Sequence, residues 1–345
     1  MNCCAECFGD YGLRQFIIPP LSTSKGQCPY CKTADVSVLP PRALAIYFES
    51  LVSAYRQDAA GKLLVQWFRE DWALFKHPRM GDTRAKRLLA EVLKDEEIVN
   101  QHVVPIADST TDSLTEWEKL RDELRYNNRY FPRPTINFNR LEELLFYLRL
   151  GNDELPPMWY RARIQTSNKP FSARKMGAPP KELASHGRAN PAGIPYLYLG
   201  SNPVTAVSEI RPHTGESACV ANFTAKHQLS VIDLRSPRKT ALAHVSPFLL
   251  DSSDVGKMRN DLLFLERLGE ELTRPVLPQA AAIDYTPSQY LCEFIKKCGY
   301  HGVVYRSSVS DGINLALFDP KLARCGTIDQ YDVDHVVVEI SSGKR

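Results

Sequence analysis

The sequence predicts an α+β protein in which a small metal-binding segment and a helical bundle precede a domain built on a mixed or antiparallel sheet. Three observations predict it: two Cys-x-x-Cys pairs near the N-terminus, apolar residues at helical spacing up to about residue 150, and short β-rich runs after it. The chain has 345 residues, with 43% hydrophobic and 24% charged residues, which is ordinary for folded domains. We therefore expect three parts, over residues 1–40, 41–150 and 151–345.

The first part contains two cysteine pairs, Cys4 with Cys7 and Cys28 with Cys31, separated by twenty residues. Two such pairs present four thiolates to one tetrahedral ion, as in a zinc ribbon. Four cysteine ligands leave no position for a water, so we expect a structural zinc rather than a catalytic one. Cys3 is an alternative ligand to Cys4, and four unrelated reduced cysteines are the alternative to a metal site.

The second part is predicted to be helical, because apolar residues recur at helical spacing in five stretches. These stretches run from Leu44 to Tyr55, Leu64 to Phe75, Ala85 to Val92, Leu114 to Leu124 and Leu141 to Leu148. A helical bundle is the expected product, with the aromatic residues in its core and not in a cofactor site.

The third part begins after a turn-rich stretch over residues 151–157, where we place the domain boundary. We predict strands at 161–166, 196–199, 218–223, 230–234, 302–306 and 314–318, with a last pair near 326–340. Helices are predicted at 203–211, 254–272 and 286–298, and Gly299 is placed to end the last of them.

Charge and hydropathy limit the partners and the cellular compartment that we expect for the chain. The formal net charge of +3 is small for this length and makes no case for nucleic acid as the main partner. No apolar run approaches the ~18 residues of a membrane span, and acidic Glu6 and Asp10 stand where a secretory signal would be apolar. Nine cysteines, an odd number, suit a reducing compartment. We therefore expect a cytoplasmic protein with no membrane contact.

A long loop rich in Gly, Pro and Arg spans residues 171–193 and precedes Tyr196, Tyr198 and Glu209. Guanidinium groups pair bidentately with phosphate, an aromatic ring stacks on a planar base, and a carboxylate steadies developing positive charge. These residue types suit a positively charged N-glycoside of a diphosphate. From residue types alone, a solvated loop with a surface ion pair is the alternative.

Four motifs carry a resemblance to a known family: Trp159–Arg163, Met176–Pro180, Gly187–Leu199 and Thr205–Pro212. They resemble the RES family, whose members are NAD-consuming toxins related in fold to ADP-ribosyltransferases. The stretches Gly302–Ser308 and Asn314–Pro320 are similar to the segment that supplies the family serine. The N-terminal half, more loosely, resembles the HEPN-like domain that precedes RES in one subgroup.

The resemblance implies site residues one position at a time. The family arginine falls on Arg161, with Arg163 as competitor, the glutamate on Glu209, and the serine on Ser307, with Ser308 adjacent. Arg188 matches the arginine of a Gly-Arg-Trp-Asn pattern in the family, although this chain has Ala189 where the pattern has tryptophan. Tyr198 matches a tyrosine at the end of the following strand. Tyr196 would face the other side of that strand, because side chains alternate.

Roles follow from the same resemblance. Arg161 and Arg188 would bind the diphosphate, Tyr198 would pack against the nicotinamide or its ribose, and Ser307 would orient that ribose. Glu209 would stabilise the cationic transition state as the nicotinamide-ribose bond breaks. The implied function is NAD breakdown by hydrolysis or phosphorolysis, acting as a toxin, with an antitoxin or immunity protein as a plausible partner.

Three alternatives stay open. The same first step serves a protein ADP-ribosyltransferase, and the sequence does not reveal the acceptor, trigger, oligomeric state or role of the helical part. A HEPN-type ribonuclease needs an arginine and a histidine a few residues apart; Arg238 and His244 have that spacing but lie in the third part. A zinc-ribbon nucleic-acid adaptor is disfavoured, because no aromatic and basic cluster accompanies the cysteines.

Overall fold

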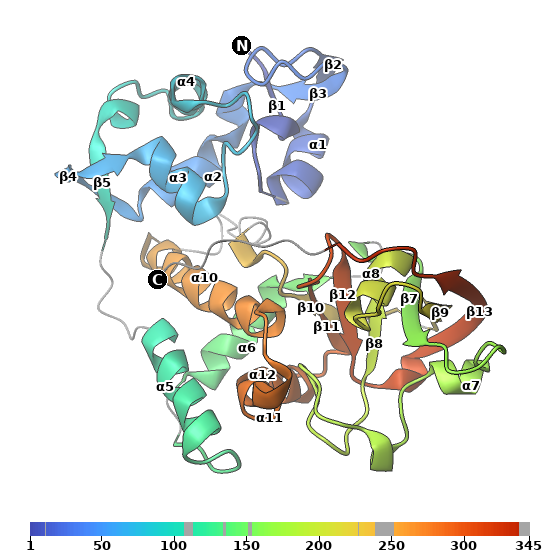
Figure 1. Cartoon of the computed structure of the whole chain (residues 1–345). Helices are drawn as coiled ribbons and strands as arrows, with labels where there is room; N and C mark the ends of the chain where they lie inside the picture. The colour runs from blue at the N-terminus through green and yellow to red at the C-terminus, as the bar shows by residue number, and fades with distance from the viewer. Residues whose placement is uncertain are drawn as a thin grey trace. The chain divides into compact units, whose positions relative to one another are not determined.

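The structure, a computed structural model, describes residues 1–10, 12–106, 113–133, 136–150, 154–226, 228–238 and 252–337. The chain forms two compact units (Figure 1), one of Met1–Leu120, Pro134–Leu148 and Ser236–Arg267 and the other of Arg121–Arg133, Arg149–Arg235 and Leu268–Arg345. Each unit combines three separate stretches of chain. The predicted domains, over 1–40, 41–150 and 151–345, are continuous stretches, and their bounds stay a prediction.

The first unit opens with a small antiparallel sheet that holds the cysteine pairs. Its strand order is β1 (Cys3–Cys4), β3 (Val36–Leu39) and β2 (Ser24–Gly26). The helical segments η1 (Ala5–Cys7), η2 (Leu13–Ile17) and α1 (Ile18–Leu21) connect β1 to β2. Consequently both cysteine pairs lie at the same small sheet: Cys4 is on β1 and Cys7 on η1, and Cys28 and Cys31 are in the connection between β2 and β3.

The predicted helices of the second part are present, with one addition. They are η3 (Pro41–Leu44) continuing into α2 (Ala45–Val52), α3 (Leu64–Trp72), α4 (Asp82–Leu93), α5 (Ser113–Tyr126) and α6 (Phe138–Tyr147). The aromatic side chains of the first stripes are core residues: Phe48 and Phe68 are buried, with ring centroids 6.0 Å apart. The remaining segments, η4 (Ile98–Asn100) and β6 (Arg149–Leu150), are short.

A two-stranded sheet, of β4 (Tyr55–Leu63) and β5 (His102–Pro105), corrects the prediction of helices alone. Tyr55 was expected to end the first helical stripe, but it pairs with Pro105 in the sheet, and its hydroxyl donates to Asp71 at 2.7 Å. The apolar spacing was not sufficient to predict this, because the strand is defined by a partner about fifty residues away and not by local periodicity.

The second unit is built on one eight-stranded sheet. Its order is β13 (Ala323–Asp332), β9 (Ser217–Ala225), β7 (Trp159–Ile164), β8 (Leu197–Gly200), β12 (Ile313–Leu317), β11 (Gly302–Arg306), β10 (Val231–Asp233) and β6. Only β10 and β11 are parallel neighbours, and the other pairs are antiparallel. The sheet is therefore mixed, which is one of the two forms that the sequence predicted. Of the pair predicted near 326–340, β13 is present, and residues 338–340 lie outside the described residues.

The predicted helices of this part are also confirmed. They are α8 (Pro203–Glu209), α10 (Ser252–Thr273) and α12 (Thr286–Lys297), joined by the shorter α7 (Ala173–Met176), η6 (Lys181–Leu183), η8 (Pro278–Ala280), α11 (Ala281–Asp284) and η9 (Pro320–Leu322). Gly299 follows α12 with φ +89°, and its N–H donates to the carbonyl of Lys296. A left-handed residue of this kind ends a helix without the steric cost that a side chain would add.

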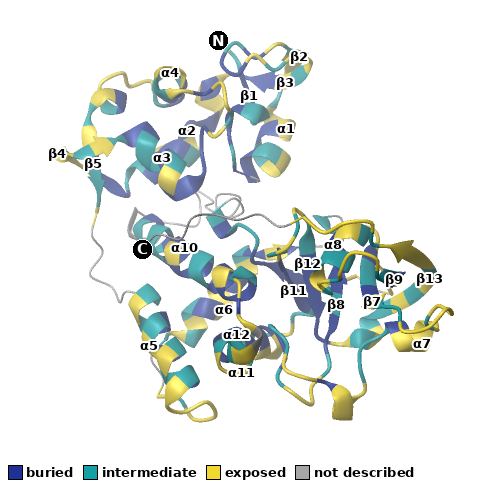
Figure 2. Ribbon diagram, in the orientation of Figure 1, coloured by how far each residue is buried: buried dark blue, intermediate teal, exposed yellow. Residues whose placement is uncertain are grey.

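The central strands of the large sheet are buried (Figure 2), and two sets of apolar side chains cover it. The larger set includes Trp159, Leu199 and Leu315; the smaller joins Ala162 and Val220 to Ala206 of α8. β7 is paired with β9 over six residues but with β8 through Tyr160 and Gly200 alone. The sheet is therefore loosely joined between β7 and β8.

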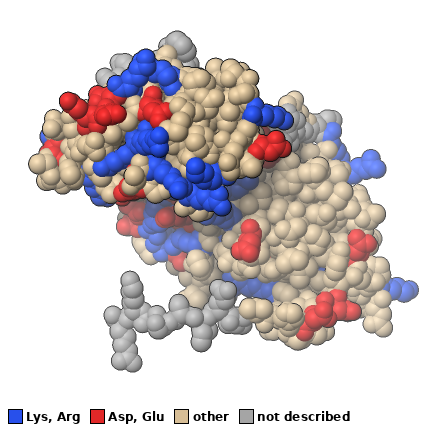
Figure 3. Space-filling view, turned by 90° about the horizontal axis from the view of Figure 1, so that it is seen from above, with Lys and Arg blue, Asp and Glu red and all other residues tan. Residues whose placement is uncertain are grey.

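Both basic and acidic side chains lie on the face drawn in Figure 3. None of the described helices is both long enough and apolar enough to cross a bilayer.

Candidate functional site

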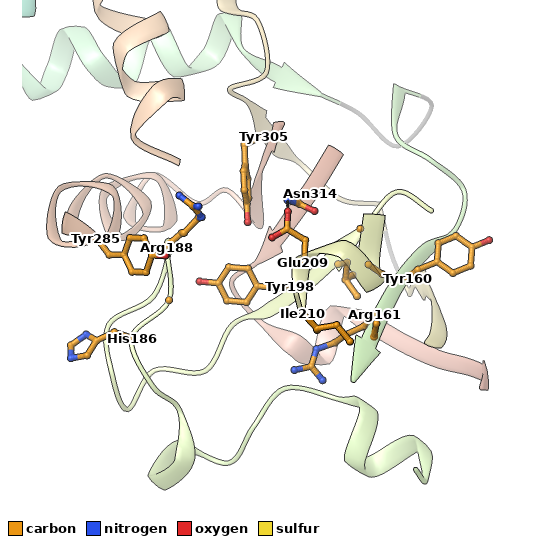
Figure 4. A pocket seen from close by; sticks show the side chains of 15 residues that line it. Tyr160, Arg161, His186, Arg188, Tyr198, Glu209, Ile210, Tyr285, Tyr305 and Asn314 are labelled. Carbon is orange, nitrogen blue, oxygen red and sulfur yellow. Dashed lines mark hydrogen bonds between the residues drawn. The ribbon is translucent and has the colours of Figure 1, made fainter. Parts of the chain in front are cut away.

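A pocket of about 290 Å³ lies where β7 and β8 meet (Figure 4). Its walls come from β7, β8, α8, the loop before β8, Tyr285, β11 and β12, and they include Arg161, Arg188, Tyr198, Glu209, Tyr305 and Asn314. Gly200 brings α8 close to β8, because a Cβ at this position would lie 2.9 Å from the backbone nitrogen of Ala206. Glycine therefore allows the helix that carries Glu209 to pack on the strand that carries Tyr198.

Glu209 is the carboxylate of this pocket. It ends α8, a helix whose start is capped by Asn202, which accepts from the N–H of Thr205 at 2.8 Å. Ser307 Oγ and Asn314 Nδ2 donate to the same oxygen, Glu209 Oε1, at 2.7 and 2.6 Å. Two donors on Oε1 fix the orientation of the carboxylate. Among the described residues, no hydrogen-bond partner is found for Oε2.

Arg161 lies on β7 at the edge of the same pocket, partly buried. Its Nη1 donates to the carbonyls of Met176 and Gly177, both at 2.7 Å. Burial, with the nearby charge of Arg163, lowers the pKa of Arg161 to about 10, so the guanidinium stays charged at neutral pH. No carboxylate pairs with it among the described residues. A cation held by carbonyl groups alone is suited to binding an anion from solution.

Arg188 provides a second guanidinium from the loop before β8. Its Nη1 donates to the carbonyl of Arg274 at 2.6 Å and its Nη2 to Ser308 Oγ at 3.3 Å, and the group lies 5.4 Å from the ring centre of Tyr285. These contacts hold the charge at the pocket wall without neutralising it.

The loop that carries Arg188 is anchored on two sides. From α12, Ser288 Oγ donates to the carbonyl of Arg188 at 2.6 Å and Gln289 Nε2 to the carbonyl of Gly187 at 2.8 Å. From β8, the Tyr198 hydroxyl donates to Asn190 Oδ1 at 2.7 Å and accepts from the N–H of Ala189 at 3.0 Å. Burial raises the pKa of Tyr198, so its hydroxyl stays protonated as a donor in this anchor.

Gly187 is a position where a side chain would disturb this anchor. A Cβ there would lie 2.3 Å from Asn190 Oδ1 and 2.5 Å from the Tyr198 hydroxyl. We expect Gly187→Ala to push the side chain of Asn190 away from the Tyr198 hydroxyl. The free energy of unfolding should then fall by about 1–3 kcal/mol, the usual cost of overpacking. Denaturant unfolding measures this effect, and Gly193→Ala, where a Cβ meets nothing within 4 Å but φ is +83°, isolates the cost of backbone strain alone. Equal stability of Gly187→Ala and the unmodified protein would contradict the expected role of the glycine.

The structure separates the residues between which the sequence left a choice. Ser307 donates to Glu209, whereas Ser308 accepts from Arg188. Arg163 does not line the pocket with Glu209; its Nη1 donates to the carbonyl of Lys175 at 2.6 Å. Thus Arg161, Arg188, Tyr198 and Glu209 share one pocket (Figure 4). Ser307 contacts this pocket through its hydrogen bond to Glu209.

Other predicted details concern the strand tyrosines and Ala189. Tyr196 is buried outside the pocket, with its ring 4.9 Å from that of Phe318, as strand alternation predicts. Ala189, which stands in place of a tryptophan, is fully buried. The hydroxyl of Tyr198, a residue that lines the pocket, is engaged by Ala189 and Asn190.

Among the lining residues that the sequence-based reasoning did not assign to the site are Asn314, Tyr305 and Tyr285. Asn314 is a buried polar residue directly before the apolar run Leu-Ala-Leu. A polar residue at the start of a buried strand could have indicated a site residue. Tyr305 is buried in β11, and burial raises its pKa well above the ordinary value. Tyr285 stands in a connection between helices, and nothing in its local sequence indicates a site.

The two cysteine pairs meet in the first unit. All four cysteines are fully buried. The sulfur atoms of Cys4 and Cys31 lie 3.4 Å apart, as do those of Cys7 and Cys28. All four sulfur atoms lie within 4.8 Å of one another. Zinc-sulfur bonds of about 2.3 Å in a tetrahedron place sulfurs about 3.8 Å apart, so the cluster fits a zinc ion. Cys3 is outside the cluster, and burial raises the pKa of its thiol to about 12.

The arginine of the possible ribonuclease pair is engaged in a different network. Arg238 Nε lies 2.6 Å from Glu266 and its Nη1 3.7 Å from Asp71, which also pairs with Arg259. These contacts are within the first unit and account for Arg238 as a structural residue. His244 lies outside the described residues.

Comparisons with known proteins give a match to a family model and matches among solved structures. The family model described as "RES domain" matches residues 158–335, more than half of the chain. Among solved structures, the chain is similar to a chain of the crystal structure of the M. tuberculosis MbcT-MbcA toxin-antitoxin complex. The identity is 12%, over 56% of this chain and 92% of that chain, with a TM-score of 0.30. A TM-score this low does not establish a shared fold. No curated protein matches the chain.

Proposed function

Because the chain belongs to the RES domain family, we propose that its pocket binds NAD and breaks the bond between nicotinamide and ribose. The observation that carries the proposal is the fixed carboxylate of Glu209, held through Oε1 by Ser307 and Asn314 in a pocket that also presents the unpaired cation Arg161. A carboxylate and a guanidinium in one small pocket match the two charges of the substrate, a cationic pyridinium and an anionic diphosphate.

The proposed reaction begins with cleavage of the bond between ribose C1′ and nicotinamide N1. The bonding electron pair leaves with nicotinamide, which becomes neutral, and C1′ becomes an oxocarbenium-like cation. Glu209 faces this charge and lowers the barrier, because the interaction strengthens as the cation develops. A nucleophile then adds to C1′; if it is water, it loses a proton, and the products are ADP-ribose, nicotinamide and H⁺.

For Ser307 we propose a part that differs from the one implied by the resemblance alone. Its hydroxyl hydrogen is used in the bond to Glu209, and its Oγ accepts from the N–H of Val309 at 3.2 Å. We therefore assign Ser307 and Asn314 to positioning the carboxylate. The ring of Tyr198 would pack against the nicotinamide or its ribose, and Arg188 would assist Arg161 with the phosphates.

The role of Arg161 leads to an expected result for binding. Arg161→Ala removes a charged contact to the diphosphate that exists before and during bond cleavage, so NAD affinity and kcat/KM should both fall, by roughly 10- to 100-fold. Calorimetric titration with NAD measures the affinity. Arg129→Ala, which removes an exposed arginine of the same unit, is the control. Unchanged affinity in Arg161→Ala would contradict the role assigned here.

The acceptor distinguishes three related activities. Incubation of the protein with NAD, with and without inorganic phosphate, and identification of the products tests them. Free ADP-ribose indicates hydrolysis, ADP-ribose 1″-phosphate indicates phosphorolysis, and labelled protein indicates ADP-ribosylation. We rank breakdown of NAD above transfer to protein. Absence of released nicotinamide both with and without phosphate would reject the proposed function.

NAD breakdown depletes a cofactor that the whole cell needs, so the activity fits a toxin that a specific inhibitor protein neutralises. Such an antitoxin or immunity protein would be the expected macromolecular partner. Expression of the chain with and without the Glu209→Gln change, followed by cell growth and NAD content, tests toxicity and its dependence on the pocket.

A structural zinc ion would be held by Cys4, Cys7, Cys28 and Cys31, because their four buried sulfur atoms lie within 4.8 Å of one another. The ion would cross-link the connections at the small N-terminal sheet and contribute to folding of the first unit. No residue of the proposed NAD pocket belongs to this cluster.

A further inference from the structure

A second cavity, of about 660 Å³, adjoins the first and shares Arg161 with it. Its walls come from β7, α7 and the loop after α7. Small-molecule pockets commonly have ~300–1,000 Å³, and the first pocket, of about 290 Å³, is at the lower end of that range. One half of a dinucleotide suits the first pocket, and the other half requires further space beyond Arg161.

The second cavity is strongly cationic. Arg161, Arg163, Arg174 and Lys175 line it, and none of the described residues in its walls is acidic. Arg174 and Lys175 have exposed side chains with no hydrogen-bond or ion-pair partner in the described part of the chain. Four neighbouring cations repel one another unless an anion lies between them, so this wall is suited to phosphate.

The opposite part of the cavity is apolar. Ala178, Pro179, Pro180 and Leu183 contribute to it, and the Leu183 side chain is unusually open for leucine, with 73% exposure. Phe171 packs beside the cavity, with its ring centre 4.6 Å from the guanidinium of Arg163. Proline and leucine surfaces of this kind cover the flat face of a purine, which a purely phosphate-binding site does not need.

We propose that this second pocket binds the adenosine phosphate half of the dinucleotide, with the diphosphate lying at Arg161 between the two pockets. The inference rests on the NAD cleavage proposed above and adds which residues select the dinucleotide. Arg174 and Lys175 contact the phosphate side, and the Pro179–Leu183 wall covers the adenine. Nicotinamide mononucleotide, which lacks the adenosine phosphate half, then uses the first pocket and Arg161 alone.

The partly buried position of Arg161 agrees with this arrangement. Its Nη1 is fixed to two carbonyls of the α7 end, and its remaining N–H groups have no partner among the described residues. Burial lowers the pKa of Arg161, repulsion from Arg163 lowers it further, and a bound diphosphate would relieve that repulsion.

The test compares two substrates on one double variant of the full chain, Arg174→Ala with Lys175→Ala. Both side chains are exposed, and the Lys175 carbonyl that Arg163 uses is retained. We expect KM for NAD to rise roughly tenfold, because two charged contacts are lost, and KM for nicotinamide mononucleotide to change by less than about twofold. Adenosine 5′-phosphate should bind the unmodified protein and lose a similar factor in affinity on the double variant, as measured by calorimetry.

The matched control is Arg129→Ala with Arg133→Ala, which removes two exposed cations of the same unit that line neither cavity. An equal rise in KM for both substrates, or no rise for NAD, would overturn the second pocket. If the unmodified protein cleaves neither substrate, the proposed function fails, but the binding of adenosine 5′-phosphate still tests the second pocket. Loss of this binding in the double variant but not in the control supports the second pocket. Equal binding of adenosine 5′-phosphate by the double variant and the unmodified protein rejects it.

Discussion

Glu209→Gln should lower the turnover of NAD by a factor on the order of 10²–10³ while changing NAD affinity much less. The amide keeps the size of the side chain and an oxygen that can accept from Ser307 and Asn314, but it removes the negative charge. That charge acts mainly when the ribose becomes cationic, so its loss raises the barrier more than it weakens binding. Nicotinamide release gives turnover, and calorimetry gives affinity.

Glu293→Gln is the matched control, because Glu293 is an exposed carboxylate of α12 that does not line the pocket. It should leave turnover unchanged. Comparison with Arg161→Ala separates the two roles: the arginine variant should lose affinity, and the glutamate variant should lose turnover. Normal turnover in Glu209→Gln would overturn the mechanism, whatever the outcome for Arg161.

Cys28→Ser should abolish binding of a metal that we expect at about one zinc per chain, and it should destabilise the first unit. Serine is a poor zinc ligand, and the three remaining thiolates would be left buried without the ion that their charges require. Elemental analysis of protein purified without chelator gives the zinc content, and thermal unfolding gives the loss of stability.

Two cysteine controls accompany this variant. Cys298→Ser changes a partly exposed cysteine outside the cluster and should retain zinc. Cys3→Ser changes the neighbour of Cys4 and should also retain it, because Cys3 lies outside the four-sulfur cluster. Absence of zinc from the unmodified protein would reject the structural metal, and loss of zinc in Cys3→Ser alone would reassign the ligand.

Much of the secondary structure could be predicted from local sequence. Turn residues delimit the short β-rich runs, and the strands β11 and β12 lie within one residue of their predicted positions. The helix α12 ends before Gly299 as predicted, since a glycine with positive φ is a local property of the chain. The sheet of β4 and β5 was missed, because its pairing depends on distant residues that no local period reveals.

The candidate site was predictable as a set of residue types and not as an arrangement. The motif positions identified Arg161, Arg188, Tyr198 and Glu209, and these four do line one pocket. The choice between Ser307 and Ser308 was not decidable from sequence, because adjacent residues of the same type differ only in what they face. In the structure one contacts Glu209 and the other Arg188.

By itself, the sequence determined the two cysteine pairs, the change from helical to β-rich patterns near residue 150, and the family motifs that contain the candidate catalytic residues. Only the tertiary structure decided that Asn314 and Ser307 hold Glu209, and that Arg163 lines a second pocket while Arg161 lines both. The reason is distance along the chain: the two donors to Glu209 are 105 and 98 residues away from it. Contacts of that range depend on strand order and on the loose join between β7 and β8, which no local pattern specifies.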